Sequence, residues 1–435
     1  MRSGATAISW LRKHARLNLA LSDQAMISGA NFATNLVLAR HLGIVEFGRF
    51  VLAWMIVLIA ASLQEGLIIA PMMSLGPTIA AAERRQYFTT VLCHQALWAA
   101  LVFSLLLSGV SASGHLAPGW QIAGLAVPLA AAAAAHLLQE FARRYHYTNG
   151  AAPTALGIDA VYYLGRLAAM LWLFRSGTVG VSAVLWTIAA AAFLSFLLGI
   201  VGFGKPRFSG AHLKRVTIRH WHFARWLGAS AVMFWACNNF FIFLAGALLG
   251  AWAVGAIKAA QDVMGVTNIL YQGIYNVVIV DAARHFQSAG AQALKHYLQK
   301  VALFGAAAVG AIGLVASAAP SVWLRLFYGD QYAGYGHLVQ WYALAYLIGF
   351  LHVPLRVGLY VAESTSAVFV GYASVAAFSL ASAYPLIRSF GLNGAMAGPV
   401  AAETIMCVVL FVLLRRRLLA RPTAAALSSA GNLPS

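Results

Sequence analysis

Long apolar stretches separated by short polar turns recur along this chain from residue 22 to residue 417. A helix needs about 20 mostly apolar residues to cross the hydrocarbon core of a bilayer. Only 9% of the residues are charged, against roughly 25% in a soluble domain, so the polar surface that a large soluble helical protein needs is missing. Open strands are excluded because lipid offers no partner for an unpaired backbone edge. The sequence therefore predicts an all-α polytopic membrane protein.

Twelve stretches are long and apolar enough to be spanning helices. They are residues 22–41, 46–72, 85–110, 120–141, 155–175, 178–202, 225–249, 252–280, 299–325, 334–361, 365–388 and 392–417. The longest basic loop, 203–224, lies between the sixth and the seventh stretch and divides them into two groups of six. The expected organisation is a basic amphipathic lead-in at 1–21, an N-terminal six-helix lobe at 22–202, the linker at 203–224, a C-terminal six-helix lobe at 225–417 and a disordered tail at 418–435.

A repeated sequence pattern relates the two lobes. NFATNLVLARHLGIVEFG begins at Asn31, and NNFFIFLAGALLGAWAVG begins at Asn238, 207 positions later. The same offset relates Gly43 to Gly250, Gly48 to Gly255, and Glu65-Gly66 to Gln272-Gly273. Six helices are an even number, so both lobes start on the same side of the membrane. The repeat thus predicts two pseudo-symmetric bundles about an axis along the membrane normal, with the substrate site between them and glycines that permit a tight turn and close helix approach.

The cations indicate the topology. The net charge of +18 suggests nucleic acid at first sight, but the lysines and arginines form short clusters between apolar runs and not one basic module, so no nucleic-acid partner is expected. If the N-terminus is cytoplasmic, most of the 29 Lys and Arg fall on the cytoplasmic side, which predicts that both termini are cytoplasmic. The segment Ile8–Ala20 is expected to lie on the membrane surface. The opposite side holds Arg40, Arg49, Arg175, Arg325 and Arg388.

Signatures of an enzyme are absent from the sequence. There is no HExxH motif, no P-loop and no paired acidic motif for a metal-bound sugar nucleotide. The three cysteines, Cys93, Cys237 and Cys407, lie in apolar runs without CxxC spacing, which argues against disulfides and a zinc site. A membrane-embedded glycosyltransferase or ligase is the enzymatic alternative, but it needs a long external loop, and the longest one here spans only 326–333. We therefore expect no enzymatic activity, no cofactor and no metal.

Polar residues inside the apolar stretches are the candidate functional residues. The first stretch carries Gln24, Ser28, Asn31 and Asn35 at helical spacing, the fifth carries Asp159, Tyr162 and Arg166, and the eighth carries Lys258, Asp262, Asn268, Gln272 and Asn276. Polar stripes facing lipid are costly, so these faces are expected to point inward. The alternative is a structural role, in which the amides hydrogen-bond between helices and Lys258 and Asp262 neutralise each other at i, i+4.

Arg166 and Glu403 lie near the midpoints of their predicted helices. An arginine at the centre of a bilayer costs roughly 2.5–3.5 kcal/mol even on the lenient insertion scale, so a partner or a function is expected. We expect Arg166 to line a polar cavity, with a structural pair, for example with Asp159, as the alternative. Glu65, Glu403 and Asp262 are candidates for coupling transport to an ion, and a structural hydrogen-bonding role is the alternative for each.

Three segments carry a resemblance to a known family. LARHLGIVEFGRF (Leu38–Phe50), LQEGLIIAPMMSLGP (Leu63–Pro77) and LRLFYGDQYAGYG (Leu324–Gly336) resemble the bacterial polysaccharide flippases, the Wzx-type branch of the MOP transporter superfamily. The resemblance implies twelve spans in two lobes in the bacterial inner membrane. It also implies transport of undecaprenyl-pyrophosphate-linked oligosaccharide by alternating access, for O-antigen, lipopolysaccharide or exopolysaccharide synthesis. Membrane lipids, a polysaccharide polymerase and chain-length machinery are the partners that go with such a function.

The resemblance gives the embedded polar residues roles. Cations such as Arg166, Lys258 and Arg40 would pair with the pyrophosphate. The polar cavity would also include Asn31, Asn238, Gln272 and Tyr162. The alternative in the same superfamily is a multidrug (MATE-like) cation antiporter, which uses acids to attract cationic drugs. The embedded acids here are matched by embedded cations, which favours the flippase.

Overall fold

The structure is a computed structural model that describes residues 2–116, 120–177 and 180–420. All regular secondary structure in these ranges is helical. The predicted tail lies outside the described residues from position 421 onward. Nine segments of the described chain are long and apolar enough to cross a membrane. The prediction of an all-helical chain with many candidate membrane-spanning helices is therefore confirmed for the described residues.

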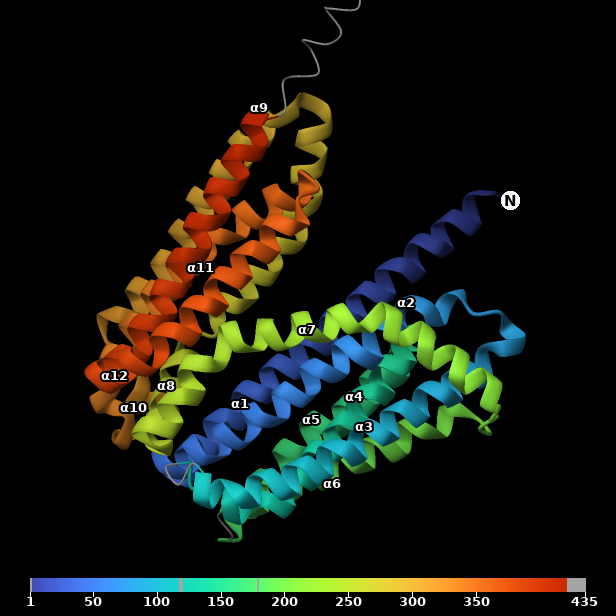
Figure 1. Cartoon of the computed structure of the whole chain (residues 1–435), viewed down its shortest axis with the longest axis horizontal. Coiled ribbons are helices and arrows are strands. Elements are labelled where there is room, and N and C mark those ends of the chain that lie inside the picture. Colours follow the sequence, from blue (N-terminus) through green and yellow to red (C-terminus); the bar gives the residue numbers. More distant parts are fainter. Residues whose placement is uncertain (1, 117–119, 178–179, 421–435) are drawn as a thin grey trace, which may run out of the picture. The chain divides into compact units, whose positions relative to one another are not determined.

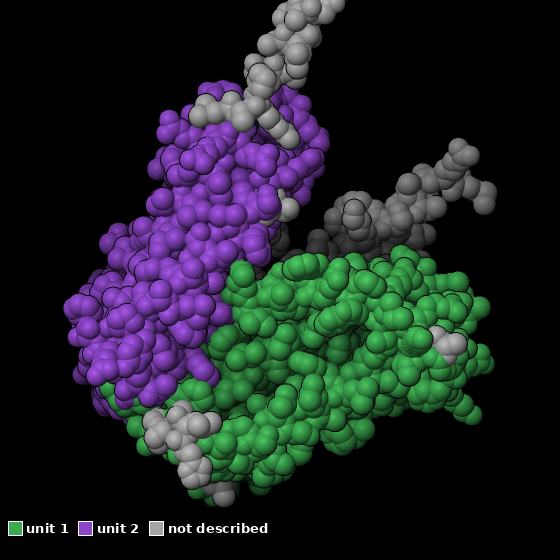
Figure 2. Space-filling view, viewed as in Figure 1, with its two compact units in different colours: residues 1–235, 250–255 green, residues 236–249, 256–435 purple. Residues whose placement is uncertain are grey.

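The chain forms two compact units, coloured separately in Figure 2. Unit 1 comprises Met1–Trp235 and Gly250–Gly255, and unit 2 comprises Ala236–Leu249 and Ala256–Ser435. The helices of unit 1 are α1 (Arg2–Gln64), a π-helix η1 (Glu65–Ile69), α2 (Ala70–Leu75), α3 (Ala81–Leu116), α4 (Ala126–Thr148), α5 (Ala152–Arg175), α6 (Val181–Ile200) and the first part of α7 (Gly210–Leu249). Short 3-10 turns include η5 (Val201–Phe203), which follows α6.

Unit 2 contains the end of α7 and most of the C-terminal half of the chain. Its helices are α8 (Ala251–Val263), whose first residues belong to unit 1, α9 (Val266–Ala318), α10 (Pro320–Tyr328), α11 (Gly336–Val361) and α12 (Thr365–Ala420). The boundary between the units thus falls inside α7 at Trp235, ten residues after position 225, where the predicted C-terminal lobe starts.

Single residues with non-helical geometry interrupt the longest helices. Gly43 in α1 has φ 81° and ψ 170°, and Gly391 in α12 has φ 55° and ψ −130°. Side chains rarely adopt positive φ, so glycine is the residue that lets the chain reverse at these points. Figure 1 shows the result within each unit, where α1 and α12 each run out and back as two legs. The turn that the sequence predicted after the first apolar stretch is present at Gly43.

The repeated pattern reappears in the backbone. Gly250 has φ 100° and ψ 172°, close to the values of Gly43 207 positions earlier. The two glycines that follow, Gly48 and Gly255, pack directly against each other. A Cβ added at Gly48 would overlap the carbonyl oxygen of Ala251, and a Cβ added at Gly255 would overlap the carbonyl oxygen of Ile44. No side chain fits between these two backbones.

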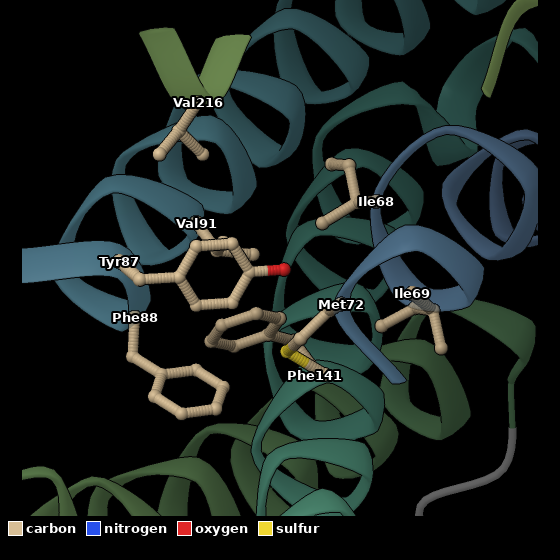
Figure 3. Packing of buried hydrophobic residues seen from close by; sticks show 8 residues of the cluster. All are labelled: Ile68, Ile69, Met72, Tyr87, Phe88, Val91, Phe141 and Val216. Carbon is tan, nitrogen blue, oxygen red and sulfur yellow. The ribbon is translucent and has the colours of Figure 1, made fainter. Parts of the chain in front are cut away.

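A hydrophobic cluster supports the polar site of unit 1. It comprises Ile68, Ile69, Met72, Tyr87, Phe88, Val91, Phe141 and Val216 from η1, α2, α3, α4 and α7 (Figure 3). Ile69, Met72 and Phe141 are fully buried, and Figure 3 shows the Phe141 ring beside the Met72 sulfur. Because Phe141 is on α4 next to Glu140, this core fixes the face of α4 that carries the ionised residues described below.

Candidate functional site: a charged cluster in the N-terminal unit

One face of α4 carries the partly buried charged and polar side chains that reach the buried carboxylates of unit 1. Gln139, Glu140, Arg143 and Tyr147 are spaced three or four residues apart from one turn to the next, so they share a side of the helix. That side contacts α1 and α5. The spacing brings the α4 side chains to carboxylates that lie far away in the sequence.

Arg143 is the centre of this arrangement. Its Nε lies 2.6 Å from Oδ2 of Asp159 on α5, and its Nη2 lies 3.1 Å from Oδ2 of Asp23 on α1. Its Nη1 lies 3.2 Å from Oε1 of Glu140, one turn away. Asp23 and Asp159 are 1% and 0% exposed, so these ion pairs are shielded from solvent and lipid. A single guanidinium therefore joins α1, α4 and α5.

Neutral and partly exposed side chains complete the cluster. The Tyr147 hydroxyl donates to Oδ2 of Asp23 at 2.6 Å, and the Gln139 amide donates to Oδ1 of Asp159 at 2.8 Å. Arg144 reaches Glu140 at 2.7 Å and Glu65 on η1 at 3.7 Å. We call this set the Arg143 cluster. Its members are Asp23, Glu65, Gln139, Glu140, Arg143, Arg144, Tyr147 and Asp159.

The charges of the Arg143 cluster do not balance. Asp23, Glu65, Glu140 and Asp159 supply four carboxylates, and the cluster has two guanidiniums. The second oxygen of Asp23, Oδ1, is buried and has no hydrogen-bond partner among the described residues. Buried charge without a partner is costly, so this cluster is suited to hold a proton or a small cation.

Arg166 forms a second, separate cluster on α5. Its Nη2 donates to Oδ1 of Asn31 at 2.8 Å, and its Nη1 donates to the Tyr162 hydroxyl at 3.3 Å. The guanidinium carbon lies 5.0 Å and 5.2 Å from the ring centroids of Tyr162 and Tyr163. The Tyr162 hydroxyl is 3.1 Å from Nδ1 of His136 on α4. Arg166 is only 3% exposed, whereas Asn31 is exposed.

Three of the residues singled out from the sequence thus lie together: Arg166, Asn31 and Tyr162. The structural alternative for Arg166, a pair with Asp159, is not what the structure shows, because Asp159 is bound by Arg143. The partners of Arg166 are neutral. Its Nε is buried and has no hydrogen bond within the described part of the chain.

The remaining candidates are dispersed. Lys258 and Asp262 form the i, i+4 pair that the sequence suggested, with 2.8 Å between Nζ and Oδ1, and Lys258 also donates to Gln261. Glu403 on α12 lies 3.0 Å from Nε2 of His352 on α11. Arg40 and Asn238 are exposed. The side chain of Gln272 lies outside what the structure describes.

Sequence reasoning missed the central residues of the larger cluster. The predicted spans 120–141 and 155–175 leave Arg143 and Arg144 in a cytoplasmic loop, but the structure places them within α4, near its end. The signal was present: Glu140 and Arg144 are spaced i, i+4, the spacing of a helical ion pair. Asp23 gave no such signal, because its partners are more than one hundred residues away. No group of His, Cys, Asp and Glu within the described ranges is arranged to hold a metal ion.

Comparison with solved structures shows that the chain has a known fold. No protein-family model and no curated protein matches the sequence. The structure is similar to an inward closed conformation of the lipid II flippase MurJ, with a TM-score of 0.71, 13% identity and 93% and 89% of the two chains covered. It is also similar to an inward-facing multidrug resistance MATE family transporter of the MOP superfamily, with a TM-score of 0.67, 14% identity and 90% and 94% covered.

A third structure carries a different description of its pocket. It is a MOP superfamily transporter from Pyrococcus furiosus with reverse polarity of its binding pocket, similar at a TM-score of 0.59 and 13% identity, with 94% and 95% covered. At such low identity the likeness establishes the fold alone. The chain therefore has the fold shared by the transporters of the MOP superfamily.

Proposed function

We propose that this protein is a flippase that moves an undecaprenyl-pyrophosphate-linked oligosaccharide across the bacterial inner membrane for surface polysaccharide synthesis. A hydrophilic glycan on a pyrophosphate does not cross hydrocarbon unaided, and a polar path through the protein would shield it while the prenyl chain stays in lipid. No bond is made or broken in this process. The likeness of the fold to a lipid II flippase supports the proposal.

The environment of Arg166 is the observation that carries the proposal. Its hydrogen-bond partners Asn31 and Tyr162 are uncharged, so no partner cancels its positive charge. Asn31 is exposed beside it, so a ligand at Asn31 lies within the field of the guanidinium. At an effective dielectric constant of about 20, an anion about 6 Å away gains about 3 kcal/mol per unit charge. A pyrophosphate fits this requirement, and a cationic drug does not.

The excess carboxylates suggest how transport is driven. We propose that the Arg143 cluster holds a coupling proton or monovalent cation at Asp23, whose Oδ1 is buried without a partner in the described structure. Of the ion-coupling candidates from the sequence, Glu65 belongs to this cluster through Arg144. Asp262 and Glu403 are paired within unit 2, with Lys258 and His352, which supports a structural role for both.

Twelve crossings and an internal repeat are part of the proposal. Ser22–Thr78 and Ser366–Arg417 contain 57 and 52 residues, and a straight helix of either length would be about 80 Å long at 1.5 Å per residue, against about 30 Å of hydrocarbon. Their breaks at Gly43 and Gly391 let each cross twice. These four crossings, the seven other apolar segments and a span near 252–280 give twelve crossings. An even number in each lobe keeps both termini and the 203–224 linker on the cytoplasmic side.

The two alternative functions would require other properties of the site or of the reaction. A MATE-like antiporter would present acids to a cationic drug, but Asp23, Glu140 and Asp159 are held by arginines. A membrane-embedded glycosyltransferase or ligase would consume its lipid-linked donor.

Deletion of the gene in its native host tests the proposal. We expect loss of surface polysaccharide and accumulation of the lipid-linked oligosaccharide in the inner leaflet, both restored by the intact gene. Increased sensitivity to cationic dyes with normal surface polysaccharide would instead support the antiporter.

A further inference from the structure

A pocket in unit 1 shares none of its lining residues with the two charged clusters. It has a volume of about 350 Å³ and opens where α3 begins and where α4 and α6 end. Arg84 and Arg85 of α3 and Asn149 after α4 line its polar side. None of the described residues that line it is acidic. The pocket is therefore built for an anion.

The two guanidiniums are available to a ligand. Neither Arg84 nor Arg85 forms an ion pair with any carboxylate of the described chain. Nε of Arg84 is buried without a hydrogen-bond partner, and its guanidinium carbon lies 5.9 Å from the centroid of the Phe88 ring. Each guanidinium presents parallel N–H donors that match the oxygens of a phosphate group. A buried donor that lacks a partner is what a phosphate oxygen would satisfy.

The linker backbone closes one side of the pocket. Gly204 follows η5 with φ 67°, and a Cβ at this position would collide with the Arg85 guanidinium. The backbone N–H of Arg207 donates to the Thr89 hydroxyl at 3.1 Å. These two contacts hold the start of the linker against α3 and fix its backbone next to Arg85.

The other side of the pocket is aromatic. Phe203 stacks on Tyr145, with 3.7 Å between ring centroids, and the edge of Tyr145 meets Phe88 at 4.9 Å. Cations on one side and aromatic rings on the other fit an amphiphile, with a phosphate next to a hydrocarbon chain. Free phosphate would make no use of the aromatic side.

The surroundings of the pocket have the composition of a membrane interface. Helix ends meet there, which is where lipid headgroups lie relative to spanning helices. Phe208 and Trp221, in the segment that follows the pocket, are 74% and 60% exposed. Lys214 and Arg215 lie between them and are exposed as well. Exposed aromatic side chains interleaved with lysine and arginine are typical of the headgroup layer.

We propose that this pocket binds the phosphate headgroup of an anionic glycerophospholipid, with Arg84 and Arg85 on the phosphate and the aromatic side against the first acyl methylenes. The site does not depend on which substrate the protein transports. Its occupant is a lipid of the leaflet at that end of unit 1.

The full-length protein in neutral detergent tests this proposal. Phosphatidylglycerol, phosphatidylcholine and inorganic phosphate are titrated separately, with lipid binding followed by native mass spectrometry and stability by the apparent Tm. We expect phosphatidylglycerol to bind and raise the apparent Tm by several degrees, and the Arg84→Gln/Arg85→Gln variant to bind it at least tenfold more weakly. The matched control, Lys295→Gln/Lys300→Gln, removes two exposed cations of α9 and is expected to behave like the parent protein.

Three outcomes would overturn the proposal. They are equal binding of phosphatidylcholine, equal loss of binding in the lysine control, and a stabilisation by inorganic phosphate that matches the lipid. The last outcome would assign the pocket to a soluble phosphate compound. Arg85 is exposed, so the single Arg85→Gln variant replaces the double variant if the latter does not purify, with at least a threefold loss expected and unchanged binding as the contradicting result.

Discussion

Gly48 and Gly255 are in backbone contact, and the contact is reciprocal. Gly48 faces the carbonyl of Ala251, and Gly255 faces the carbonyl of Ile44. Ile44 and Ala251 are 207 positions apart, as are Gly48 and Gly255. A contact in which each residue meets the counterpart of the other is the signature of a two-fold axis. This contact is the observation that best supports the proposed internal symmetry.

The first prediction concerns this glycine contact. We expect Gly48→Ala and Gly255→Ala each to lower the free energy of unfolding by about 1–3 kcal/mol, because the added Cβ overlaps backbone that has no room to give. The double variant should lose less stability than the sum of the two single losses, since one displacement of the two backbones relieves both overlaps. Thermal unfolding of the purified protein measures these effects.

Gly29 supplies the control for this prediction. It lies on the same helix, and nothing lies within 4 Å of a Cβ placed there. Gly29→Ala should therefore keep or raise the stability, because alanine is favoured over glycine in a helix by about 1 kcal/mol. If Gly48→Ala unfolds at the same temperature as Gly29→Ala, the close approach is not present in the protein.

The second prediction concerns Arg143. Arg143→Gln leaves Asp23 and Asp159 buried without their cation, and breaking a buried ion pair in this way costs about 3–5 kcal/mol. We expect low abundance in the membrane and a strongly reduced Tm. The added change Asp159→Asn should restore part of the stability, because it removes one of the two buried charges that have lost their cation.

Arg144→Gln is the matched control for Arg143→Gln. Its guanidinium is 31% exposed and its partner Glu65 is 47% exposed. Its other partner, Glu140, keeps an ion pair with Arg143 when Arg144 is removed. The loss should therefore be only about 1 kcal/mol. Equal destabilisation by the two variants would contradict the central place given to Arg143.

The third prediction concerns coupling at Asp23. Asp23→Asn keeps an acceptor for Tyr147 and Arg143 but removes the charge that would hold a proton or cation. We expect flipping driven by an imposed ion gradient to fall at least tenfold, with gradient-independent exchange retained. Glu46→Gln removes an acid that pairs with Arg49 outside the cluster and should leave both rates unchanged. An unaltered gradient response in Asp23→Asn would contradict coupling at this carboxylate.

The fourth prediction concerns topology. In a variant that lacks Cys93, Cys237 and Cys407, Lys205→Cys should not react with a membrane-impermeant maleimide in intact cells, because the linker is proposed to be cytoplasmic. Ser176→Cys, in the exposed turn after α5, should react. The reverse pattern would overturn the proposed orientation.

Local patterns in the sequence predicted the features that depend on neighbouring residues. The turn at Gly43 and the pair of Lys258 with Asp262 both arise within a few residues, so periodicity and spacing were sufficient to find them. The all-helical class could be predicted from the apolar runs, because a backbone in lipid has to satisfy its hydrogen bonds within the protein.

The charged clusters depend on packing between distant segments. Asp23 and Arg143 are 120 residues apart, and His352 and Glu403 lie on separate helices. No spacing rule joins such residues before the helices are packed. Arg143 and Arg144 also resemble the basic residues that flank spanning helices, so the positive-inside pattern assigned them to a loop.

The central claim is that Arg166 attracts the pyrophosphate of a lipid-linked oligosaccharide. The most direct measurement is the rate at which a labelled undecaprenyl-pyrophosphate oligosaccharide changes leaflets in proteoliposomes that contain the parent protein, Arg166→Lys or Arg166→Ala. Arg166→Lys keeps the positive charge, so it should retain part of the flipping rate. Arg166→Ala should reduce the flipping rate at least a hundredfold, although the folded protein is present at its normal level. Adding Asp159→Asn should not rescue it, since Asp159 is paired with Arg143. Flipping at the parent rate by folded Arg166→Ala would contradict the account.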